Sequence, residues 1–151
     1  MSGVLASYVG SEKPWHCPAD RNYRRQVDRG GKRSYSITGL MHGERPNDPK
    51  CVDKMGEIVT PAIKIVFLEN TDDRGWNIGS WIMNYGSSPS WIDPLAIFHN
   101  DRSTIGFADG HAEKHRWLDG DTIRDAGGDS QAPSLGRDVQ WMSDHYVPGR
   151  R

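Results

Sequence analysis

The stretch that decides the predicted fold is Thr104-Ile-Gly-Phe-Ala-Asp-Gly-His-Ala-Glu-Lys-His-Arg-Trp117. It contains two arms of strand-like composition, Thr104–Ala108 and His111–Trp117, on either side of Asp109-Gly110. An Asp-Gly pair suits a two-residue type I′ turn, in which both central residues need a positive φ. The stretch therefore predicts an antiparallel β-hairpin with Asp109 and Gly110 in its turn.

Further strands are predicted on the N-terminal side of this hairpin. Ala62–Leu68 reads Ala-Ile-Lys-Ile-Val-Phe-Leu, and its β-branched and aromatic residues favour a strand over a helix at this length. Shorter strands are predicted at Tyr35–Thr38 and Ile78–Met83, with a loop at Gly86–Ser90. Leu5–Val9 fits either a strand or the end of a helix.

One helix is predicted near the C-terminal end of the chain, at Asp138–Tyr146. Asp138 would be its N-cap, and Val139 and Met142 would form its apolar side. Together with the predicted strands, this helix indicates an α+β fold with an antiparallel sheet and long irregular loops.

Length and composition bound the fold and its partners. The chain has 151 residues, so we expect residues 1–151 to form a single globular domain. A hydrophobic share of 35%, with 17 Gly and 9 Pro, predicts a thin core and much loop. The formal charge of −1 gives no support for nucleic acid or an anionic membrane as a partner. No apolar run approaches the ~18–20 residues of a membrane helix, so we expect no membrane span in this chain.

The two cysteines, Cys17 and Cys51, leave two possibilities open. A disulfide between them would close a loop of about 35 residues and contribute roughly 3–4 kcal/mol in the chain-entropy model. The alternative is two reduced thiols, because two cysteines alone do not define a compartment.

A resemblance to a known family rests on the spacing of His99, which stands nine residues before Asp109-Gly110. This pattern resembles the H-X9-DG domain of prepilin-type processing-associated proteins, which are pseudopilin-like proteins abundant in planctomycetes, verrucomicrobia and lentisphaerae. Other segments resemble the same family in the same order: Trp15–Asp20, Ser34–Gly39 (with Thr38 in place of the usual Asn), Ile65–Glu69, Gly110–Asp119 and Asp138–Met142.

The resemblance implies a structural protein and not an enzyme. It predicts the globular domain of a pseudopilin, acting in a type II secretion or pilus-like assembly through contacts with other pseudopilin or secretion-system proteins. It implies a location in the cell envelope or outside the cell, and such export favours the Cys17–Cys51 disulfide. Family members begin with a leader and a long apolar prepilin helix, and this sequence contains neither, so we expect the globular portion without that helix.

The sequence contains residues for two candidate metal sites. His111, Glu113 and His115 alternate along the second hairpin arm, so a strand would project all three to one face. With His99 they would form a recognised set of zinc or iron ligands. The simpler interpretation is a polar, solvent-facing side of a strand.

The second site would bind calcium in the acidic loop that follows Ala62–Leu68. Its ligands would be Glu69, Asp72 and Asp73, helped by Asn70 and Thr71, because calcium prefers oxygen ligands. Major pseudopilins of the type II secretion system bind calcium in a loop of their C-terminal domain, and this loop is similar in kind only. A solvated acidic turn is the simpler interpretation, so calcium is the candidate cofactor and the sequence establishes none.

Hydrolytic catalysis has little support in the sequence. His99 could be combined with Asp101 or Asp109 and one of several serines, but there is no Gly-x-Ser-x-Gly motif. We expect His99, Asp109 and Gly110 to be structural instead, with the imidazole of His99 bonded to a carboxylate or carbonyl near the turn.

The alternative function is a secreted carbohydrate- or metal-binding module on the same fold. Trp76, Trp81, Trp91 and Trp141 could stack on sugars, which requires at least three of them exposed on one plane. Because Trp more often fills a core, we expect these residues, and Trp117, to be packed inside.

Overall fold

A five-stranded sheet forms the centre of the computed structural model, which describes residues 6–21, 33–41, 44–71, 79–126 and 136–149. The strand order is β3-β1-β2-β6-β7. The bounds are β1 (Tyr35–Thr38), β2 (Ile65–Glu69), β3 (Ser80–Trp81), β6 (Arg102–Phe107) and β7 (Ala112–Arg116). All neighbouring strands are antiparallel except β1 and β3, which are parallel. The predicted α+β class is confirmed.

The predicted hairpin is formed by β6 and β7, which pair from Arg102↔Arg116 to Gly106↔Ala112. Its turn differs from the prediction. The N–H of Gly110 donates to the carbonyl of Phe107 at 3.0 Å, and only Gly110 of the Asp-Gly pair has a positive φ, of 97°. These features define a three-residue loop with a glycine bulge, so the predicted type I′ turn is wrong.

Of the other strand predictions, one is confirmed and two are confirmed in part. β1 has the predicted bounds, but β2 begins at Ile65 because the preceding residues form a short 3-10 helix, η5 (Pro61–Ile63). Ile78 lies outside the described residues, and the remainder of Ile78–Met83 is divided between β3 and β4 (Met83–Asn84).

The division between β3 and β4 lies at Ile82, whose N–H donates to the carboxylate of Asp93 at 2.8 Å. Ile82 belongs to neither strand. Beyond it, β4 pairs with β5 (Ser90–Trp91) as a separate two-stranded sheet. The predicted loop Gly86–Ser90 lies between the two strands, except that Ser90 is already the first residue of β5.

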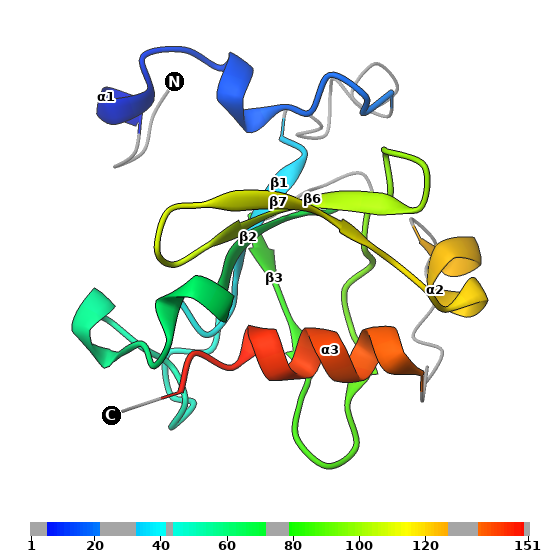
Figure 1. Ribbon diagram of the computed structural model, residues 1–151. Coiled ribbons are helices and arrows are strands. Elements are labelled where there is room, and N and C mark those ends of the chain that lie inside the picture. The colour runs from blue at the N-terminus through cyan, green and yellow to red at the C-terminus, as the bar shows by residue number, and fades with distance from the viewer. Residues whose placement is uncertain (1–5, 22–32, 42–43, 72–78, 127–135, 150–151) are drawn as a thin grey trace.

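The predicted C-terminal helix is α3 (Arg137–Tyr146), and it covers one face of the sheet (Figure 1). Its N-cap is Gly136, so the prediction of Asp138 as N-cap is wrong. Val139, Met142 and Tyr146 are buried against the sheet, at the spacing of one helix face.

The opposite face of the sheet is covered by the N-terminal segment, residues 6–21 (Figure 1). This segment contains α1 (Ala6–Val9), so the helical alternative for Leu5–Val9 is the one observed, and the 3-10 helix η1 (Lys13–Trp15). The remaining short helices are η4 (Met55–Glu57) and α2 (Gly120–Asp125). None of the described helices has the length and apolar character needed to cross a bilayer.

The main core lies between the sheet and α3, and tryptophans occupy its centre. Trp81, Trp91 and Trp117 are buried there, with T-shaped ring contacts between Trp81 and Trp91 and between Trp91 and Trp117. Trp76 lies outside the described residues. The predicted core packing is confirmed for Trp81, Trp91 and Trp117, and burial removes Trp81 and Trp91 from the alternative sugar-stacking face.

His115 is expected to make stability fall in mild acid. Its ring stacks on Trp141 with centroids 3.6 Å apart, and burial, opposed by the Glu113 and Asp138 charges, lowers its pKa. The unfolded chain therefore takes up a proton more readily than the folded chain, and folding stability is lost as the pH falls through about 6.5, the ordinary histidine pKa. Chemical denaturation at about pH 7.5 and about pH 5.5 should show this loss.

The matched variants for this test are His115→Gln and His111→Gln. The first should lose part of the difference in unfolding free energy between the two pH values. The second replaces an exposed turn residue and should keep it. Parallel pH dependences for His115→Gln and the original chain would contradict the prediction.

Candidate functional site

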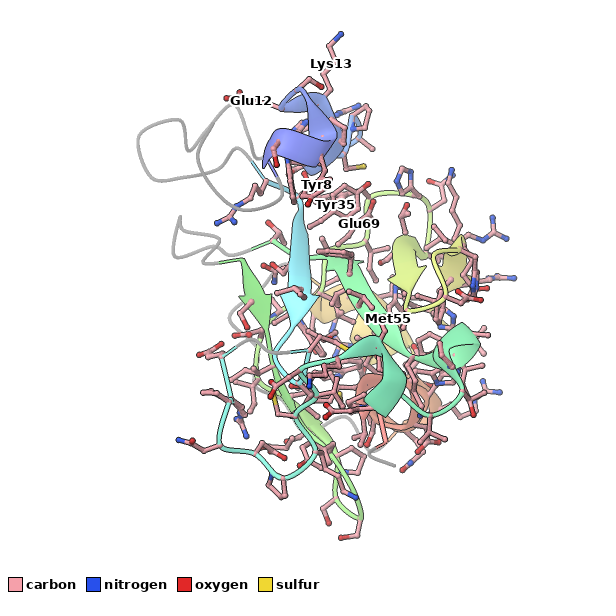
Figure 2. The ribbon with its side chains drawn as sticks, turned by 90° about the vertical axis from the view of Figure 1, so that its left-hand side faces the viewer. Tyr8, Glu12, Lys13, Tyr35, Met55 and Glu69 are labelled. Atoms are coloured by element: carbon pink, nitrogen blue, oxygen red, sulfur yellow. The ribbon has the colours of Figure 1, made fainter. Side chains whose placement is uncertain are left out.

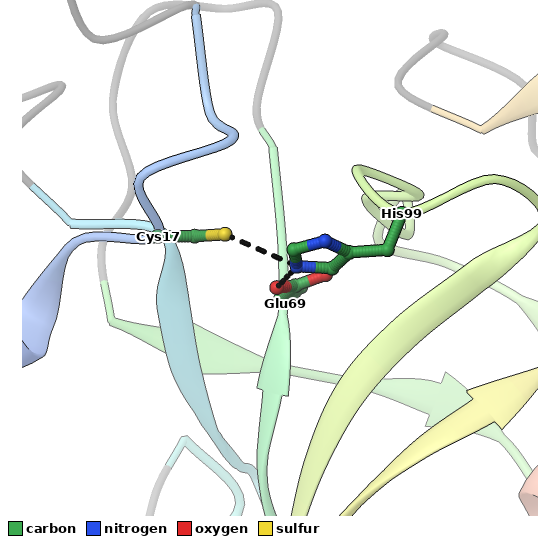
Figure 3. A group of neighbouring side chains, drawn as sticks. All are labelled: Cys17, Glu69 and His99. Carbon is green, nitrogen blue, oxygen red and sulfur yellow. Dashed lines mark hydrogen bonds and ion pairs between the residues drawn. The ribbon is translucent and has the colours of Figure 1, made fainter.

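A buried cluster of Cys17, Glu69 and His99 lies between the N-terminal segment and the sheet (Figure 3). His99 Nε2 lies 3.4 Å from Cys17 Sγ and 3.1 Å from Glu69 Oε1. Cys17 is 1% exposed, Glu69 is 0% exposed, and the His99 side chain is 23% exposed. Within the described part of the chain, this is the only group of three or more Cys, His, Asp or Glu whose ligand atoms lie within 4.8 Å of one another.

Cys17 is held in place by the turn that follows η1. The N–H of Asp20 donates to the carbonyl of Cys17 at 2.9 Å, and the carboxylate of Asp20 accepts from the hydroxyl of Ser34 at 2.6 Å. The N–H of Ser34 in turn donates to the carbonyl of Trp15 at 2.9 Å. These bonds attach the N-terminal segment to the start of β1.

Glu69 and His99 are positioned by the sheet and by a tight turn. Glu69 is the last residue of β2 and pairs with Tyr35 of β1, and Figure 2 shows both residues below the N-terminal helices. His99 is followed by Asn100 and Asp101, with φ of 49° and 57°. Asn and Asp are the residues that most readily adopt this left-handed conformation, which turns the chain into β6.

The hydrogen bonding of the cluster is incomplete. Both Cys17 Sγ and Glu69 Oε1 face the same ring nitrogen, so one proton on Nε2 cannot serve both contacts. If Nε2 carries the proton, it donates to Glu69, and the S–H of Cys17 is left to the same carboxylate; if Nε2 is unprotonated, the S–H can donate to it, but its lone pair then faces Glu69 Oε1. Glu69 Oε2 is also buried and has no hydrogen-bond partner among the described residues.

The thiol and the neighbouring phenol are both held in their neutral forms. Burial, and after it the Glu69 carboxylate, raises the pKa of the Cys17 thiol. Burial, together with Cys17 and Glu69, raises the pKa of Tyr35. A protonated, enclosed thiol is a poor nucleophile, because the thiolate is the reactive form.

An apolar cavity of about 320 Å³ adjoins the cluster at Tyr35. It lies between the N-terminal segment and the outer face of the sheet. Its walls are formed by Val9, Pro14, Trp15, Tyr35, Phe67, Thr104, Gly106 and Ala112. Small residues on β6 and β7 leave this space open, because neither Gly106 nor Ala112 has a side chain that reaches across it.

The predicted calcium loop is only partly described. Asp72 and Asp73 lie outside the described residues. Glu69 belongs to β2 and points into the buried cluster, and Asn70 is also buried, with its amide bonded to Ser36 and to the carbonyl of Pro94. The prediction that Glu69 lies in an exposed acidic loop is therefore wrong.

The predicted site of His111, Glu113, His115 and His99 is not assembled. His111 Nδ1 bonds to Asp109 at 2.6 Å and its ring stacks on Phe107, whereas His115 stacks on Trp141. His99 lies with Cys17 and Glu69. Of the predicted set, Glu113 and His115 do come close, with Glu113 Oε1 3.8 Å from His115 Nδ1, whereas His111 and His99 have other partners.

The Cys17–Cys51 disulfide is not formed in the structure, where both residues are buried free thiols. The sheet separates them. Cys17 belongs to the N-terminal segment and lies beside His99, whereas Cys51 belongs to the main core with Leu40. The predicted bridge is therefore replaced by two thiols in different surroundings.

The three residues of the His99–Gly110 motif serve two different parts of the fold. Asp109 accepts the N–H of His111 at 3.1 Å, and Gly110 completes the turn. The carboxylate partner of His99 is Glu69, so the predicted bond from His99 toward the turn is wrong in its partner. The backbone N–H of His99 separately donates to the carbonyl of Arg102 at 3.2 Å.

Comparison with known proteins gives no match for this chain among protein-family models, curated proteins or solved structures.

Proposed function

We propose that this chain is a non-catalytic structural domain of a type II secretion or pilus-like assembly, acting through contacts with pseudopilin-like proteins in the cell envelope or outside the cell. One observation supports this proposal most. Four of the segments that resemble the H-X9-DG family meet in one buried polar network, although they are far apart in the sequence.

The network contains one or two residues from each segment. Trp15–Asp20 contributes Cys17 and Asp20, and Ser34–Gly39 contributes Ser34. Ile65–Glu69 contributes Glu69, and the His99–Gly110 motif contributes His99. Such contacts join the N-terminal segment, β1, β2 and the turn before β6. A motif whose residues bond mainly to one another is more suited to building a domain than to acting on a substrate.

The orientation of His99 also favours a structural role over nucleophilic catalysis. In a nucleophile–histidine–acid relay the nucleophile and the acid contact opposite nitrogens of the ring. Here Cys17 and Glu69 both contact Nε2. Cys17 is also enclosed, so no substrate reaches its sulfur in this arrangement.

Site-specific photo-crosslinking in the organism that carries the gene tests the proposal. A crosslinking residue would replace Tyr8 or Met55, which are 86% and 59% exposed, and Tyr146, which is buried, would serve as the control position. We expect adducts with proteins that carry a prepilin-type helix from at least one exposed position and only background from Tyr146. The proposal would be overturned if no adduct contained such a protein and if deletion of the gene left secretion and surface filaments unchanged.

A further inference from the structure

We propose that Cys17, Glu69 and His99 bind one divalent transition-metal ion of the zinc class. This inference goes beyond the assembly role and is independent of it. The three side chains offer one sulfur, one nitrogen and one or two oxygens, which is a mixed set that zinc accepts. Their ligand atoms already lie within 4.8 Å of one another.

The distances fit a tetrahedral ion. With bonds of about 2.3 Å to sulfur and about 2.0 Å to nitrogen and oxygen, a tetrahedral site places S and N about 3.5 Å apart and N and O about 3.3 Å apart. The corresponding distances here are 3.4 Å for Cys17 Sγ to His99 Nε2 and 3.1 Å for His99 Nε2 to Glu69 Oε1. Small adjustments of the side chains would therefore admit the ion.

A cation also resolves the incomplete hydrogen bonding. Ligand atoms of Cys17, His99 and Glu69 converge on one region, and Glu69 Oε2 is buried without a hydrogen-bond partner among the described residues. A buried polar atom without a partner costs about 1–3 kcal/mol, and a buried carboxylate more. Coordination would occupy the Nε2 lone pair, the sulfur and a carboxylate oxygen at once.

The exposure of the three residues indicates how an ion would enter, and their number leaves one coordination position open. Cys17 and Glu69 are enclosed, so an ion would enter past His99, the most exposed of the three. Three protein ligands leave one tetrahedral position, which water would occupy. Binding of zinc releases the thiol proton of Cys17 to solvent as the sulfur–metal bond forms.

Zinc and cobalt binding to the full chain tests this proposal. Apo protein in a thiol-free reducing buffer would be titrated with Zn²⁺ by calorimetry and with Co²⁺ by absorption. We expect one ion per chain, a thiolate-to-cobalt charge-transfer band, and a melting temperature raised by about 5–10 °C at a hundredfold excess over Kd. Calcium should produce none of these changes.

Variants distinguish this site from other binding. Cys17→Ser and His99→Gln should each lower zinc affinity at least tenfold, and Cys17→Ser should abolish the charge-transfer band. Cys51→Ala and His111→Gln, which alter the other cysteine and an exposed histidine, should bind as the original chain does. Equal affinity in Cys17→Ser and Cys51→Ala would overturn the proposal.

The original chain alone provides a second test that holds even if a variant fails to fold. X-ray absorption at the zinc edge should report one sulfur ligand, with the remaining ligands nitrogen or oxygen. A shell of oxygen alone, or no uptake of zinc and cobalt by the folded chain, would show that the cluster is an ion pair beside a thiol and not a metal site.

Discussion

Replacing Trp117 with alanine is expected to lower the free energy of unfolding by about 3–5 kcal/mol. Trp117 is 1% exposed and lies between β7 and α3, with edge contacts to Trp91 and Trp141. Its indole N–H donates to the hydroxyl of Ser103 at 2.7 Å, and that hydroxyl donates onward to the carbonyl of Ala96. The variant therefore loses ring packing and one buried hydrogen bond together. Urea denaturation followed by circular dichroism would measure the loss.

Two further variants separate the causes. Trp117→Phe keeps an aromatic ring but removes the N–H, so we expect a smaller loss, of about 1–2 kcal/mol. Leu118→Ala changes the next residue, which is 53% exposed, and should cost within about 0.5 kcal/mol. If Trp117→Ala costs no more than Leu118→Ala, the placement of Trp117 in the core is wrong.

Local patterns were sufficient for the elements whose cause is local. The Asp109-Gly110 pair predicts a hairpin because a glycine with positive φ closes such turns, whichever turn type forms. Tyr35–Thr38 and the C-terminal helix were predicted with bounds within one residue of those observed, since their strand residues and apolar spacing act over a few positions. The start of β2 was missed because Pro61 begins a 3-10 turn in a run that otherwise reads as strand.

The candidate site could not be predicted because its residues are brought together by the sheet order. Cys17, Glu69 and His99 each lie in a segment that carries the family resemblance, but no spacing links them. Their meeting depends on β2 lying between β1 and β6, and on the N-terminal segment covering the outer face. The sequence does indicate one potential ligand in each segment, next to a predicted strand or turn. The sequence alone, however, assigns these three ligands to separate sites.

Replacing Asp138 with alanine is expected to lower the free energy of unfolding by about 2–4 kcal/mol. Asp138 is 2% exposed, and its carboxylate accepts the N–H groups of Leu118, at 2.9 Å, and Asp119, at 2.8 Å. The carboxylate of Asp119 accepts the N–H of Asp138 in return, at 2.8 Å. This reciprocal pair joins the end of β7 and the start of α2 to the first turn of α3, where the negative charge also suits the helix dipole. Alanine leaves two backbone donors without this acceptor.

The comparison of Asp138→Asn with Asp144→Ala tests whether the bonding or the charge accounts for this cost. Oδ2 accepts both N–H groups, so asparagine with its carbonyl oxygen at that position keeps these bonds without the charge, and we expect about half of the alanine effect, measured by urea denaturation at neutral pH. Asp144 lies on the exposed side of the same helix, and its replacement should change stability by within about 0.5 kcal/mol. Equal losses in Asp138→Ala and Asp144→Ala would show that the carboxylate does not hold these elements together. Equal losses in Asp138→Ala and Asp138→Asn would assign the effect to the charge and not to the number of accepted bonds.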